Sequence, residues 1–76
     1  MSRNNLILVV SVKGRYYVIP DVCADTEWNV RYAYGVLKGR RYMRDRGKAL
    51  ILAHDMQRRQ QTEYGVRELR IYEHLP

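Results

Sequence analysis

The segment Leu-Ile-Leu-Val-Val-Ser-Val, residues 6–12, decides the fold class of this chain. It is rich in β-branched residues and apolar on both faces, which is typical of a strand in the centre of a sheet. Lys13 and Gly14 supply turn residues, and the segment Arg-Tyr-Tyr-Val-Ile, residues 15–19, predicts the returning strand of a hairpin. Pro20 is expected to end that strand, because proline cannot donate a hydrogen bond to a neighbouring strand.

The first helix is predicted to cover Glu27 to about Leu37, where apolar residues recur at helical spacing. Asp25 or Thr26 is the expected N-cap, since a short polar side chain can accept a hydrogen bond from the first helical turn. Gly39 is the expected C-cap.

The second helix is predicted over residues 46–60, with Asp45 as its N-cap. Residues 66–72 alternate imperfectly between apolar and polar and predict a third, more exposed strand, in which Arg67 and Arg70 oppose pairing between sheet edges. The inward positions of the second helix are expected to be Ala49, Leu52, Ala53 and Met56.

These elements predict a single domain, residues 1–76, of the α+β class with the order β-β-α-α-β. A three-stranded sheet with two helices packed on one face is the simplest arrangement that buries both apolar helix stripes. If the helices form a hairpin, the last strand runs parallel to the first. The first strand then lies in the centre, between the other two.

Cysteine content and the amino-terminal sequence bear on the cellular compartment. Cys23 is the single cysteine, so no intramolecular disulfide can form, and a Cys/His zinc site has too few ligands. The apolar run near the amino terminus is too short and too interrupted for a signal peptide or a membrane span. We therefore expect a cytoplasmic protein with no membrane contact, no bound metal and no cofactor.

Most of the net charge lies between Lys38 and Lys48, a stretch called the basic segment below. It holds six cations and one acid, and so carries +5 of the formal net charge of +6. Arginine forms bidentate hydrogen bonds with phosphate or carboxylate, and tyrosine offers a ring on which other groups can stack. The alternative is that the basic segment is a solvated connection between the two helices, whose arginines only keep a small protein soluble. The residues predicted to bind a partner are Lys38, Arg40, Arg41, Tyr42, Arg44, Arg46 and Lys48.

A second cationic pair, Arg58 and Arg59, lies at the end of the second predicted helix and is a secondary binding candidate. The helix dipole favours cations at this position, which gives the pair a structural explanation as well. Whether the pair joins the basic segment depends on how the helices cross.

Catalysis has few candidate residues. His54 and Asp55 point about 100° apart on a helix, so together they cannot hold one ion without further ligands. An ion pair between Asp55 and Arg58 or Arg59 explains the acid more simply. The sequence places no base beside Cys23, which is expected to be a buried thiol. We therefore predict no catalytic residue and no enzymatic activity.

Four stretches of the chain carry a resemblance: Tyr17–Val22, Ala24–Asn29, Asp45–Leu50 and Thr62–Val66. They resemble segments of small uncharacterised open reading frames of tailed bacteriophages. The resemblance implies a viral accessory protein that acts in the host bacterial cytoplasm by occupying a surface of host machinery. Such a surface would belong to RNA polymerase, a nucleoid protein or a CRISPR surveillance complex. The resemblance supplies no functional residue.

The leading hypothesis is therefore a non-enzymatic binding module that docks its basic segment on an acidic surface of a host protein. One alternative is a nucleic-acid-binding protein that contacts the phosphate backbone. Another is a structural protein that self-associates, for example as a homodimer that pairs through an edge strand.

Overall fold

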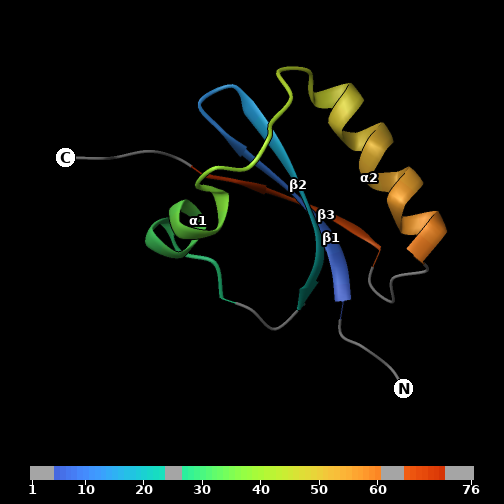
Figure 1. Cartoon of the computed structure of the whole chain (residues 1–76), viewed down its shortest axis with the longest axis horizontal. Helices are drawn as coiled ribbons and strands as arrows, with labels where there is room; N and C mark the ends of the chain where they lie inside the picture. Colours follow the sequence, from blue (N-terminus) through green and yellow to red (C-terminus); the bar gives the residue numbers. More distant parts are fainter. Residues whose placement is uncertain (1–4, 24–26, 61–64, 72–76) are drawn as a thin grey trace.

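The computed structural model describes residues 5–23, 27–60 and 65–71, which form one three-stranded sheet and two helices (Figure 1). The predicted α+β class and the order β-β-α-α-β are confirmed. The elements are β1 (Asn5–Val12), β2 (Arg15–Cys23), α1 (Val30–Leu37), α2 (Arg46–Gln60) and β3 (Val66–Arg70).

β1 is the central strand, as its apolar sequence predicts. It pairs antiparallel with β2 and parallel with β3, which gives the strand order β2-β1-β3. Residues 6–10 of β1 are buried, because neighbouring strands cover both edges and side chains cover both faces. The hairpin turn between β1 and β2 places Lys13 and Gly14 at positive φ, 50° and 71°, as a two-residue type I′ turn requires.

β2 continues past Pro20 to Cys23, so the predicted end of this strand is wrong. A β-bulge accommodates the proline, since Pro20 and Asp21 together stand opposite the single β1 residue Ile7. β2 is also an edge strand, where a residue without an N–H group is tolerated. Asp21 adopts a φ of 59° in the bulge.

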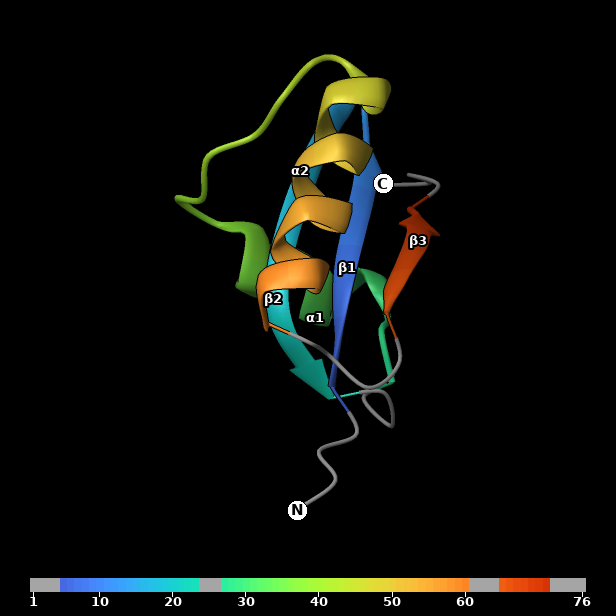
Figure 2. The ribbon, with the colours of Figure 1, turned by 90° about the vertical axis from the view of Figure 1, so that its right-hand side faces the viewer.

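The two helices lie on opposite faces of the sheet, so the predicted packing on one face is wrong (Figures 1 and 2). Figure 2 shows α2 in front of the sheet and α1 behind it. On the α2 face, Ala49 and Ala53 pack against Ile7 and Val9. The opposite core contains Leu37 of α1 and the alternate β1 residues Leu6, Leu8, Val10 and Val12.

The apolar character of β1 on both faces explains this arrangement. If both helices lay on one face, the side chains of either the even-numbered or the odd-numbered residues of β1 would be exposed to water. Burial of each apolar side chain stabilises the fold by about 1.5–3 kcal/mol, so each face needs its own cover.

Among the described residues, no helix is both long enough and apolar enough to cross a membrane.

α1 begins at Val30 rather than at Glu27, and its N-cap is Asn29. The Oδ1 atom of Asn29 accepts a hydrogen bond of 2.8 Å from the backbone N–H of Tyr32. The predicted caps, Asp25 and Thr26, lie outside the described residues.

The other two predicted caps lie at or beside their expected positions. Lys38 is the C-cap of α1, and Gly39 follows it with a φ of 78°. At the start of α2, the Oδ1 atom of Asp45 accepts a hydrogen bond of 3.1 Å from the backbone N–H of Lys48. Asp45 is therefore the N-cap, as predicted.

Candidate binding surface

The basic segment crosses the outer edge of β2 on its way from α1 to α2 (Figure 1). Met43 pairs antiparallel with Tyr16 of β2 through two backbone hydrogen bonds of 2.8 and 2.9 Å. This bridge fixes the middle of the segment to the sheet edge. Its cationic side chains can therefore reach either face of the sheet.

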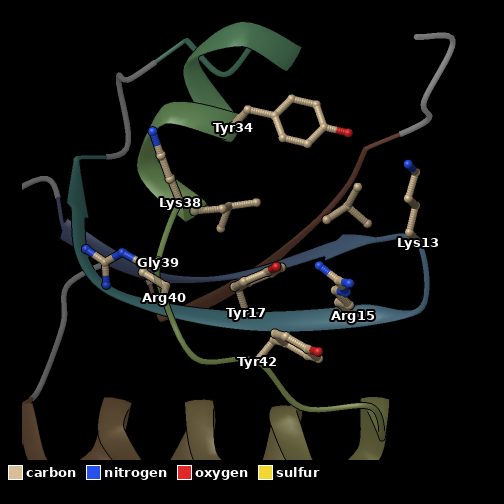
Figure 3. Close-up of a pocket in the computed structure, with 10 residues that line it drawn as sticks. Lys13, Arg15, Tyr17, Tyr34, Lys38, Gly39, Arg40 and Tyr42 are labelled. Carbon is tan, nitrogen blue, oxygen red and sulfur yellow. The ribbon is translucent and has the colours of Figure 1, made fainter.

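A cavity of about 580 Å³ lies between the β-hairpin, the end of α1 and the basic segment (Figure 3). We call it the α1-side cavity. Figure 3 shows Lys13, Arg15, Lys38 and Arg40 around the central Tyr17. Among the described residues, no acidic side chain lines it. The apolar and aromatic side chains that line the cavity are Val12, Tyr17, Tyr34, Leu37 and Tyr42.

Tyr42 makes three side-chain contacts, of which two connect the basic segment to the hairpin and one lies within the segment. Its ring centroid lies 5.6 Å from that of Tyr17. The Cζ atoms of Arg15 and Arg44 lie over the Tyr42 ring, 4.7 and 5.6 Å from its centroid. Both distances are within the range of a cation–π interaction. Tyr42 therefore gathers one arginine of β2 and one of the basic segment around a single ring.

Arg40 and Arg41 are neighbours in sequence, but they line different cavities. Arg40 lines the α1-side cavity, and its Nε atom donates a hydrogen bond of 3.1 Å to the carbonyl oxygen of Val36. Arg41 lines a cavity of about 360 Å³ on the α2 side of the sheet. Tyr42 lines both cavities. The predicted patch is thus divided by the sheet edge rather than gathered on one face.

Arg46, a predicted binding residue, is engaged inside the molecule. Its Nε and Nη2 atoms donate hydrogen bonds to the Oε1 and Oε2 atoms of Glu68 in β3, each at 2.9 Å. This bidentate geometry is the one that arginine would also use on a partner's carboxylate. Lys48, in the first turn of α2, is exposed.

Arg58 and Arg59 both pair with Asp55, at N–O distances of 3.6 and 2.9 Å. The predicted helical ion pairs of Asp55 are therefore confirmed. These arginines close the 15-residue helix α2, whereas the basic segment leads into its start. The two ends of such a helix are about 20 Å apart, so the secondary pair does not join the basic segment.

The predicted binding residues did not include four charged or aromatic residues that line the α1-side cavity: Lys13, Arg15, Tyr17 and Tyr34. Lys13 and Arg15 flank Gly14 in the hairpin turn. They approach the basic segment because Met43 pairs with Tyr16, a long-range contact that no local pattern signals.

Cys23 is exposed, so the expectation of a buried thiol is wrong. It is the last residue of β2, beyond the bulge, where the strand leaves the core. His54 is also exposed, and His74 lies outside the described residues. Within residues 5–23, 27–60 and 65–71, no three His, Cys, Asp or Glu side chains are grouped so that they could hold a metal ion.

No family model, curated protein or solved structure matches this chain.

Proposed function

We propose that this chain is a non-enzymatic binding module that docks on an acidic surface of a partner protein. One observation carries the proposal: Arg15 and Arg44 converge on Tyr42, beside a cavity whose rim includes Lys38 and Arg40. Several guanidinium and ammonium groups side by side repel one another and attract anions. A partner's carboxylates would relieve that repulsion and accept charge-assisted hydrogen bonds.

The division of the basic segment favours a protein partner over nucleic acid. A nucleic-acid backbone is bound best by cations that follow its regularly spaced phosphates along one track. Here Arg40 and Arg41 line cavities on different faces, and Arg46 is paired with Glu68. What remains on the α1 face is a compact group around a hollow, which suits a projecting segment of a protein.

We further infer that the protein acts in the bacterial cytoplasm, on host machinery. The support is the sequence resemblance to phage open reading frames and the single cysteine, which favours a reducing compartment.

The test is affinity purification from a nuclease-treated bacterial lysate, with the wild type and two variants of equal charge change. In the first variant, Lys38→Ala/Arg40→Ala, we expect at least tenfold weaker retention of the partner. Loss of one charge-assisted hydrogen bond costs about 1.5–3 kcal/mol, and about 1.4 kcal/mol is already tenfold. In the matched control, Arg58→Ala/Arg59→Ala, we expect wild-type retention, because these arginines already pair with Asp55.

Circular dichroism must show that both variants keep the wild-type fold. Equal retention by the Lys38→Ala/Arg40→Ala variant and the wild type would contradict the proposal. If nuclease treatment removes everything that the wild type retains, the nucleic-acid alternative replaces it.

A further inference from the structure

We infer that the α1-side cavity receives an apolar side chain from a segment of the partner protein whose neighbouring residues are acidic. This inference rests on the proposed function and specifies the chemistry that the partner presents.

The interior of the α1-side cavity is suited to an apolar group. Val12, Tyr17 and Leu37 belong to the hydrophobic core and are only 5%, 6% and 5% exposed. The volume of about 580 Å³ lies within the range of about 300–1,000 Å³ that is usual for ligand sites. An inserted leucine or aromatic ring would therefore continue the core that these residues begin.

The rim of the same cavity is suited to carboxylates on both sides of that apolar group. Lys13 and Arg15 come from the hairpin, and Lys38 and Arg40 come from the basic segment, so cations lie on both sides of Tyr17 (Figure 3). Acidic residues just before and just after the inserted side chain would each meet a cation. Such charge complementarity fixes the register of a bound segment and speeds its association.

A nucleotide base fits this cavity less well than an apolar side chain. A base would bind by stacking on an aromatic ring, and the Tyr42 ring already contacts Tyr17, Arg15 and Arg44. A base would therefore have to displace existing contacts before it could stack.

Fluorescence anisotropy with three labelled probes tests the inference. The probes are a short polyglutamate peptide with one central leucine, the same peptide with alanine in place of leucine, and a thymidine oligonucleotide of equal length. We expect the leucine peptide to bind at least tenfold more tightly than the alanine peptide. The Lys38→Ala/Arg40→Ala variant should lose at least tenfold in affinity for the leucine peptide, whereas Arg58→Ala/Arg59→Ala should bind it like the wild type.

Other outcomes distinguish failure of the cavity inference from failure of the proposed function. If both peptides bind equally and the Lys38→Ala/Arg40→Ala variant binds both more weakly, the cavity inference fails and docking on an acidic protein stands. If only the oligonucleotide binds, or none of the three probes binds, both fail. If the Arg58→Ala/Arg59→Ala variant weakens binding as much as the Lys38→Ala/Arg40→Ala variant does, the peptide is not bound specifically at the α1-side cavity, and the cavity inference fails.

Discussion

Replacement of Ala53 by aspartate is expected to remove a large share of the stability of the domain. Ala53 is fully buried where α2 packs on the sheet, in the cluster that contains Ile7 and Val9. An unpaired carboxylate at that position would cost about 3–5 kcal/mol. A domain of this length has roughly 4–11 kcal/mol of stability in total. We therefore expect thermal melting, followed by circular dichroism, to show a melting temperature at least about 12 °C below that of the wild type.

The matched control is Ile51→Asp, which introduces the same side chain on the same helix. Ile51 is apolar but 70% exposed, so this change should alter the free energy of unfolding by only about 0.5 kcal/mol. Equal melting temperatures for the Ala53→Asp and Ile51→Asp variants would show that α2 does not pack through its alanine face.

Replacement of Tyr17 by alanine has the second largest expected effect. Tyr17 is 6% exposed in the core on the α1 face, and its ring contacts Tyr42. Truncation of a buried aromatic ring to alanine costs about 3–5 kcal/mol, from lost burial and from the cavity that is left. Urea unfolding should therefore show a strongly lowered midpoint for Tyr17→Ala.

Tyr17→Phe is the control, because it keeps the ring that fills the core. We expect it to lose less than about 1.5 kcal/mol, as volume-conserving changes usually do. A loss below about 1 kcal/mol for Tyr17→Ala would contradict the packing described here, since a ring this buried cannot be removed at so low a cost.

The sheet and its strand order could be predicted because β1 carries the information locally. Its residues 6–10 are apolar at every position, and only a central strand covered on both faces buries all of them. The same argument, followed further, requires a helix on each face. The prediction that both helices pack on one face of the sheet was wrong because it considered the apolar stripes of the helices and not the second apolar face of β1.

Helix α2 shows why inward positions are hard to identify from apolar residues. Of the four positions predicted to face inward, Ala49 and Ala53 are fully buried, whereas Leu52 and Met56 are half-buried. The helix therefore packs on the sheet through its smallest apolar side chains. Hydrophobicity ranks leucine above alanine, so the pattern does not identify this contact.

Ion pairs between residues close in the sequence could be predicted, whereas an ion pair between distant residues could not. The pairing of Asp55 with Arg58 and Arg59 follows from helical spacing, and the sequence predicts it. Arg46 and Glu68 are 22 residues apart, and their ion pair depends on how α2 and β3 meet. The concentration of charge in the basic segment could thus be predicted, but not which of its arginines the molecule itself engages.

A titration of isotope-labelled protein with the leucine-containing polyglutamate peptide, followed by NMR, maps the binding surface directly. We expect chemical-shift changes at the backbone amides of residues 13–17 and 38–44, with little change at Arg58 and Arg59. Both affected segments contribute to the cationic cavity around Tyr42. Shift changes centred on the end of α2, or none at saturating peptide, would contradict the claim that this surface binds acidic partners.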